Sequence, residues 1–127
     1  DGHVSEGSGE NIFLILGGKL ITPPSSDDIL MGITRDTVIN LAKNELGIDT
    51  VERQVDRSEL YVADECFFTG TAANVAPILE IDHRPIGDGK TGEVTTKLQR
   101  LFAGVMAGRN PKYADWYYSV SAKPVEV

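Results

Sequence analysis

Short apolar runs that flank turn-forming pairs predict two β-hairpins. The runs at 11–16 and 19–22 flank a Gly-Gly pair, and two apolar runs around a glycine pair are typical of a hairpin with a tight turn. The runs at 75–81 and 84–86 flank an Asp-His pair and predict a second hairpin. Further strands are expected over 50–55 and 66–69.

Two segments have the 3.6-residue periodicity of helices. Their apolar positions are Val38, Leu41, Ala42 and Leu46 in the first, and Val94, Leu98, Leu101, Phe102, Val105 and Met106 in the second. The first predicts a helix over about 35–46, with Thr34 as N-cap and Gly47 as C-cap. The second predicts a strongly amphipathic helix that ends near Gly108. A single helical turn capped by Ser58 is expected over 58–63.

Strands and helices alternate without a linker, which predicts one domain of mixed α/β class over residues 1–127. With 127 residues, of which 41% are hydrophobic, the chain is long enough to bury a core. The aromatic residues near the end are expected to pack back on the domain. These residues are Tyr113, Trp116, Tyr117 and Tyr118.

The composition of the chain argues against several classes of binding partner. The net charge of -7 and the pI near 4.7 argue against nucleic acid or an anionic membrane surface. No apolar stretch approaches the roughly 20 residues of a membrane helix. The single cysteine, Cys66, cannot form an intrachain disulfide and is expected to be buried, so we expect a cytoplasmic protein. His3 and His83 have no metal-ligand partners at useful spacing, and no metal site is predicted.

Three polar segments at the ends of apolar elements are candidates for chemistry. Glu6, in a Gly/Ser-rich segment before a strand, has a carboxylate that can pair with a protonated ring nitrogen. The segment 32–34 precedes a predicted helix, whose first N–H groups attract anions. The turn at 69–74 offers backbone N–H groups and the Thr71 hydroxyl. Each segment alone also fits an ordinary solvated turn or helix start.

Together, the three segments resemble the fold-type IV (class IV) aminotransferases that use pyridoxal phosphate. The matching segments, in family order and spacing, are Gly2-His3-Val4-Ser5-Glu6-Gly7-Ser8-Gly9-Glu10-Asn11-Ile12-Phe13, Leu30-Met31-Gly32-Ile33-Thr34-Arg35-Asp36 and Ala63-Asp64-Glu65-Cys66-Phe67-Phe68-Thr69-Gly70-Thr71-Ala72-Ala73. The resemblance implies the C-terminal, cofactor-binding domain of such an enzyme, with β-hairpins, a mixed sheet or pseudo-barrel and two main helices. The N-terminal domain of the family would not be part of these residues.

The resemblance also implies roles for five residues. Glu6 would pair with the pyridine nitrogen. Ile33 and Thr34 would bind the cofactor phosphate through backbone N–H groups, and Thr34 also through its hydroxyl. Thr71 would bind the phosphate through its hydroxyl, and the Thr71-Ala72 turn would offer N–H groups to the substrate carboxylate.

Within the family, Glu10-Asn11 and Gly70-Thr71-Ala72-Ala73 are similar to branched-chain amino acid aminotransferases. The implied reaction moves an amino group between leucine, isoleucine or valine and 2-oxoglutarate, in a protein that is a homo-oligomer. Alternatives are a D-amino acid aminotransferase, an aminodeoxychorismate lyase, or a non-catalytic module that binds phosphate or cofactor. The Schiff-base lysine of the family is expected upstream of residue 1. No catalytic residue is therefore assigned here, and these 127 residues alone are expected to be inactive.

Overall fold

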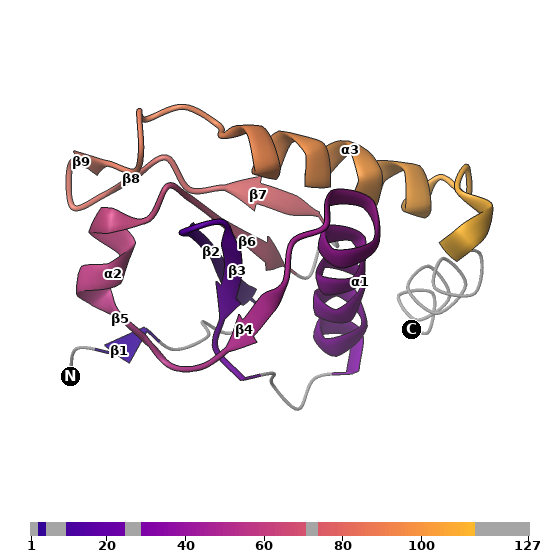
Figure 1. Cartoon of the computed structure of the whole chain (residues 1–127), viewed down its shortest axis with the longest axis horizontal. Coiled ribbons are helices and arrows are strands. Elements are labelled where there is room, and N and C mark those ends of the chain that lie inside the picture. Colours follow the sequence, from indigo (N-terminus) through magenta and orange to yellow (C-terminus); the bar gives the residue numbers. More distant parts are fainter. Residues whose placement is uncertain (1–2, 5–9, 25–28, 71–73, 114–127) are drawn as a thin grey trace.

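The computed structural model describes residues 3–4, 10–24, 29–70 and 74–113 and is built around a mixed five-stranded sheet (Figure 1). The strand order is β4-β3-β2-β6-β7, in which only the β3–β4 pair is parallel. The strands are β2 (Glu10–Leu16), β3 (Lys19–Thr22), β4 (Thr50–Glu52), β6 (Glu65–Gly70) and β7 (Val75–Pro77).

Two long helices, α1 (Ile29–Leu46) and α3 (Glu93–Met106), cover one face of the sheet (Figure 1). Because successive strand residues point to opposite faces, Phe13 and Phe67 lie on the helix side, where their rings stack with centroids 4.9 Å apart. The main core lies between these rings and the inward faces of the helices. The predicted mixed α/β class with two main helices is confirmed.

The opposite face of the sheet carries a second, smaller core. Leu14 and Cys66 are fully or nearly fully buried there, against the short helix α2 (Arg57–Val62). The remaining elements on this side are β1 (His3–Val4), which pairs with β5 (Val55–Asp56), and the hairpin of β8 (Glu80–Ile81) and β9 (Arg84–Pro85). Cys66 is therefore the buried residue that its apolar context predicted.

Both predicted hairpins form, but the second is shorter than predicted. The run expected over 75–81 is divided into β7, which pairs with β6, and β8, which alone pairs with β9. The β2–β3 turn uses Gly17 at φ 60° and Gly18 at φ 79°, the left-handed region that a glycine enters without steric cost. Asp82 and His83 adopt φ 53° and 65° in the β8–β9 turn. The Asp82 carboxylate accepts a hydrogen bond from Arg57 Nη2 at 2.7 Å and another from the Tyr61 hydroxyl. This pairing ties the second hairpin to α2.

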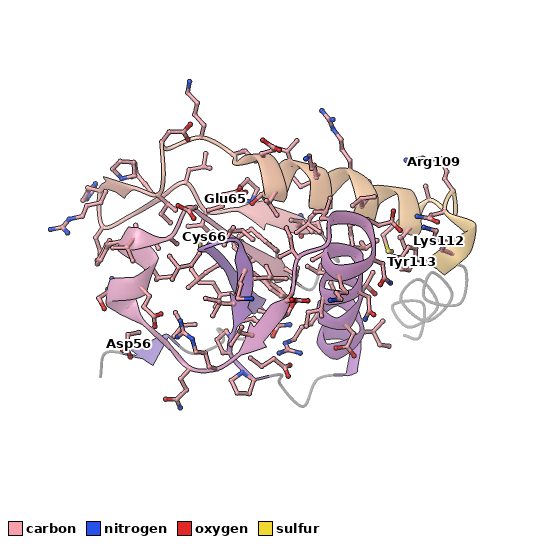
Figure 2. All side chains as sticks on the ribbon, viewed as in Figure 1. Asp56, Glu65, Cys66, Arg109, Lys112 and Tyr113 are labelled. Carbon is pink, nitrogen blue, oxygen red and sulfur yellow. The ribbon has the colours of Figure 1, made fainter. Side chains whose placement is uncertain are left out.

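The second amphipathic helix is confirmed, and its first turn is held by a residue of the sheet. Glu65, at the start of β6, accepts hydrogen bonds from Val94 N (3.0 Å), Thr95 N (2.7 Å) and Thr95 Oγ1 (2.7 Å). Figure 2 shows Glu65 between the sheet and α3. The N-cap residue, Gly92, has no side chain to satisfy these donors, so a carboxylate from the sheet satisfies them.

The predicted start of the first long helix is wrong. The helix α1 begins at Ile29 rather than near residue 35, so Thr34 lies in its second turn and is not an N-cap. Gly32 was interpreted as the residue before the helix, but a Cβ at this position would meet nothing within 4 Å and the helix continues through it. The C-terminal end is as predicted: Gly47 adopts φ 69°, and its N–H donates to the Lys43 carbonyl at 3.1 Å.

Two smaller expectations also need correction. The strand expected over 50–55 is divided into β4 and β5. The short helix α2 is capped by Asp56 rather than Ser58, since the Glu59 carboxylate accepts from the Asp56 N–H at 2.9 Å. In the tail, Tyr113 packs into the main core as expected, with 4% of its surface exposed, while Trp116, Tyr117 and Tyr118 lie outside the described residues. None of the helices in the described residues combines the length and apolar character needed to cross a bilayer.

Candidate functional site

Several strands begin or end at one edge of the sheet. Glu10, the first residue of β2, pairs with Gly70, the last residue of β6. The strand β3 runs antiparallel to β2 and ends at Thr22, whose hydroxyl donates to the Ile12 carbonyl at 2.7 Å. The strand β4 runs parallel to β3, and its last residue, Glu52, pairs with Thr22. The start of β2 and the ends of β3, β4 and β6 therefore share this edge.

The N-terminal part of α1 lies at the same edge. The Arg35 guanidinium donates from Nη2 to the Pro23 carbonyl at 3.1 Å, directly after the end of β3. The same Nη2 forms an ion pair with the Glu52 carboxylate at the end of β4. Thr34 precedes Arg35 in the helix, so this part of α1 lies at the end of the sheet where β3 and β4 end.

This edge is rich in buried polar side chains. We call this set the polar edge, and its members are Asn11, Thr22, Thr34, Arg35 and Thr69, each with at most 2% of its surface exposed. Asn11 and Thr69 are cross-strand partners on the face that carries Phe13 and Phe67. Buried polar atoms destabilise a fold unless they find partners, so any member of this set without a partner among the described residues is a candidate for binding a ligand.

Two hydroxyl groups at the polar edge have no hydrogen-bond partner among the described residues. Thr34 Oγ1 and Thr69 Oγ1 are buried and form no hydrogen bond with any described residue. A hydroxyl can donate one hydrogen bond and accept others, which suits an anionic oxygen such as that of a phosphate. The residues present therefore fit an anionic group at this edge.

The amide groups of Ile33 and Thr34 are placed differently from the prediction. Within α1 they follow Ile29 and Leu30 by four residues, so the helix pairs these N–H groups with the carbonyls of those residues. The expectation that they are free amides of a first turn is therefore wrong for the described helix, because the helix starts earlier. The Thr34 hydroxyl, in contrast, forms no hydrogen bond with the helix or with any other described residue.

Of the other predicted site residues, Glu6, Thr71 and Ala72 lie outside the described residues. In the sequence, Glu6 stands four residues before Glu10, and Thr71 directly follows Gly70. The described residues nearest to these segments in the sequence are Glu10 and Gly70, which pair with each other across β2 and β6.

The sequence analysis placed Thr69 in a candidate turn and Arg35 in a family segment, but it assigned no role to either side chain. The sequence could have indicated that Thr69 faces the core, because strand alternation places it on the same face of the sheet as Phe67. No local signal marked Arg35, since its partner Glu52 lies 17 residues further along the chain.

The single cysteine does not contribute a nucleophile to the site. Cys66 lies on the opposite face of the sheet, 2% exposed, and burial raises the pKa of its thiol to about 12. Among the described residues, no group of three or more His, Cys, Asp or Glu side chains is arranged to hold a metal ion.

Comparisons with known proteins match this arrangement to one family. The family model for amino-transferase class IV matches residues 1–81, which include the start of β2, the polar edge and the end of β6. The chain belongs to the class IV aminotransferase family. Its mixed sheet and helices are thus the fold of a class IV aminotransferase, and the polar edge is its candidate site.

Several relatives of this class IV chain carry a more specific name. A probable branched-chain-amino-acid aminotransferase of Aquifex aeolicus is 51% identical over 122 residues, which are 96% of this chain and 39% of the relative. The branched-chain-amino-acid aminotransferase of Pseudomonas aeruginosa is 49% identical over 116 residues, 91% of this chain and 37% of the relative. The chain thus spans less than half the length of these curated relatives.

Solved structures with the same fold are also branched-chain amino acid aminotransferases. The Thermobaculum terrenum enzyme in its PLP form aligns with a TM-score of 0.81 and 45% identity, over 91% of this chain and 38% of that one. A second such enzyme, complexed with N-(5'-phosphopyridoxyl)-L-glutamate, aligns with a TM-score of 0.82 and 44% identity, over the same shares of the two chains.

Proposed function

We propose that this class IV chain is the cofactor-binding domain of a branched-chain amino acid aminotransferase. The whole protein would transfer an amino group between leucine, isoleucine or valine and 2-oxoglutarate, with pyridoxal phosphate as cofactor. It would be a cytoplasmic homo-oligomer. The observation that carries the proposal is the polar edge, where Thr34 and Thr69 keep buried hydroxyls without partners among the described residues, beside the Glu10–Gly70 strand pair.

The similarity to named enzymes supports the substrate class. Relatives at 51% and 49% identity carry the branched-chain name, and the segment Gly70-Thr71-Ala72-Ala73 resembles that group of enzymes. Solved relatives hold pyridoxamine 5'-phosphate or are in the PLP form. These findings concern the relatives, and they favour the same cofactor and substrates here.

Within this proposal, the hydroxyls of Thr34 and Thr71 donate hydrogen bonds to the cofactor phosphate. The N–H groups of Ile33 and Thr34 join them only if the carbonyls of Ile29 and Leu30 release these donors.

Two further groups of the chain act on the ring and on the substrate. The Glu6 carboxylate holds a proton on the pyridine nitrogen, because a nearby anion favours the charged form of that base. The Thr71-Ala72 amides orient the substrate by its carboxylate. Pyridoxal phosphate, when bound, supplies an electron sink that protein side chains do not offer.

The lysine that bonds covalently to the cofactor is assigned to another part of the whole protein. The chain spans 39% of its A. aeolicus relative, and none of its lysines stands at the family position. These lysines are Lys19, Lys43, Lys90, Lys97, Lys112 and Lys123. The 127 residues by themselves should therefore show no amino transfer above background, and activity above background would contradict this assignment.

The test compares cofactor forms in the full-length protein. Thr34→Val and Thr71→Val should weaken the binding of pyridoxal phosphate but leave the binding of pyridoxal, which lacks the phosphate, nearly unchanged. Each lost hydrogen bond to a charged oxygen is worth about 1.5–3 kcal/mol, or roughly ten- to a hundredfold in Kd. Equal losses for both compounds in equilibrium dialysis would refute a phosphate site at this edge.

Substrate assays separate the alternatives. A branched-chain enzyme should release glutamate from leucine and 2-oxoglutarate, while D-alanine as donor would indicate a D-amino acid aminotransferase. Release of pyruvate from aminodeoxychorismate would indicate the lyase. Glu6→Ala should lower kcat strongly while the cofactor still binds, and an unchanged kcat would remove Glu6 from its assigned role.

A further inference from the structure

We propose that Arg35 is a positioning residue that fixes the phosphate-binding part of α1 against the polar edge. Arg35 does not itself touch the cofactor in this proposal. It holds Thr34 in place by joining α1 to the ends of β3 and β4. The inference rests on the proposed function, because it assigns Arg35 a purpose at the phosphate site.

The contacts of Arg35 join the helix α1 to the strands β3 and β4. Its Nη2 donates to the Pro23 carbonyl at 3.1 Å and pairs with Glu52, while Nη1 lies 3.8 Å from Asp36 Oδ1. Arg35 therefore joins the helix to Pro23, which directly follows β3, and to Glu52, the last residue of β4. The Arg35 side chain is only 3% exposed, so water does not screen these contacts strongly.

Charge balance argues for a positioning role over direct binding. A buried guanidinium is stable only when it is paired, and Glu52 supplies the compensating negative charge from a half-exposed position. Arg35 Nε is buried and forms no hydrogen bond with any described residue, so a direct role for this donor has to be tested. The two roles make opposite predictions for Glu52.

If Arg35 positions Thr34, a substitution of either Arg35 or Glu52 that weakens their ion pair also weakens phosphate recognition. If Arg35 binds the phosphate directly, removing the Glu52 charge frees positive charge for the ligand and strengthens phosphate recognition. Glu52→Gln therefore separates the two roles by the sign of its effect. It also leaves the buried arginine in place, so folding is less at risk than in an Arg35 variant.

The experiment uses the apo form of the full-length protein and measures the ratio of Kd values for pyridoxal and pyridoxal phosphate. Glu52→Gln should lower this preference for the phosphorylated form by about threefold and by no more than about fivefold, since half-exposed ion pairs contribute up to about 1 kcal/mol. Arg35→Leu should lower it by about tenfold or more, because a buried charged hydrogen bond is also lost. Arg35→Lys should restore part of the preference.

A matched control is available on the residue after Glu52. Arg53 forms an ion pair with Glu59 at 2.6 Å, but this pair joins the β4–β5 segment to α2 rather than to α1. Arg53→Ala should leave the preference for the phosphorylated form unchanged. A drop as large as that of Glu52→Gln would show that any ion pair of this region has the same effect, and it would overturn the positioning role.

The outcomes separate the inference from the proposed function. If Thr34→Val and Thr71→Val lower the preference while Glu52→Gln and Arg35→Leu do not, the phosphate site stands and the positioning role of Arg35 is refuted. An increased preference in Glu52→Gln refutes it as well, in favour of direct binding. If no variant changes the preference, the phosphate site itself is refuted and the inference falls with it.

Discussion

Replacing Glu65 with alanine is expected to loosen the first turn of α3 from the sheet. In the native protein its carboxylate accepts from Val94 N, Thr95 N and Thr95 Oγ1 at 2.7–3.0 Å. The N-cap residue Gly92 offers no side chain in its place. The substitution therefore removes every side-chain partner that the structure gives to these donors at the start of α3.

The size of the effect follows from three contributions. Loss of an N-cap costs about 0.5–2 kcal/mol, and loss of a negative charge at a helix N-terminus costs about 0.3–1 kcal/mol. Thr95 is 1% exposed, so its hydroxyl stays buried without its partner at a further cost of about 1 kcal/mol. We expect Glu65→Ala to lower the free energy of unfolding by about 2–4 kcal/mol, and Glu65→Gln, which keeps an acceptor oxygen, by about half as much.

Urea denaturation of the protein gives the global loss, and amide hydrogen exchange at Val94 and Thr95 reports the local one. Glu93→Ala is the matched control, because Glu93 is also acidic and in the first turn of α3 but forms only an exposed pair with Lys97 at 2.9 Å. Its loss should stay within about 1 kcal/mol, because Glu93 contributes only its charge at the helix N-terminus and an i,i+4 pair. If Glu65→Ala costs no more than the control, the capping role of Glu65 is refuted.

A double-mutant cycle sharpens the test. A Cβ on Gly92 would lie 2.0 Å from Glu65 Cδ, so Gly92→Ala forces the capping carboxylate to move. The two substitutions should therefore be strongly non-additive: Gly92→Ala destabilises the native protein but costs little once Glu65 is alanine. Additive losses in urea denaturation would show that Glu65 does not occupy this position.

Three other positions give independent predictions. Because burial raises the pKa of the Cys66 thiol from 9.0 to about 12, its contribution to stability should be complete below about pH 9 and lost as the pH rises towards 12. Cys66→Ala should flatten this part of the pH–stability curve, and the native thiol should resist disulfide reagents that react with it after unfolding. Gly32→Ala should stabilise α1 by about 0.5–1 kcal/mol in thermal denaturation, because the helix continues through this position and a Cβ there would meet nothing within 4 Å. A loss of stability would contradict a helical residue at this position. Gly87→Ala should cost about 1–3 kcal/mol in urea denaturation, since Gly87 has φ 59° and a Cβ would lie 2.5 Å from the Asp64 carbonyl oxygen. Gly18→Ala, which is left-handed but open, should cost less.

Local chemistry was sufficient to predict many elements from the sequence. The glycine pair at 17–18 fixed the first hairpin because few other residues accept positive φ at both turn positions. The periodicity from Val94 to Met106 fixed α3, and the face that it identified is the face that is buried, including Leu98 and Val105. The order of the three polar segments was enough to indicate the family that the comparisons show.

The tertiary structure decided what depends on partners distant in the sequence. The start of α1 at Ile29 is not marked by any apolar period, and Gly32 offered a misleading boundary. Glu65 caps a helix 29–30 residues further along, and Arg35 finds Glu52 across 17 residues. Such contacts form only after the chain has closed these loops, so no local pattern encodes them. For the same reason, the sequence determined which residue types the site contains, whereas strand register and helix packing determined that they meet at one edge of the sheet.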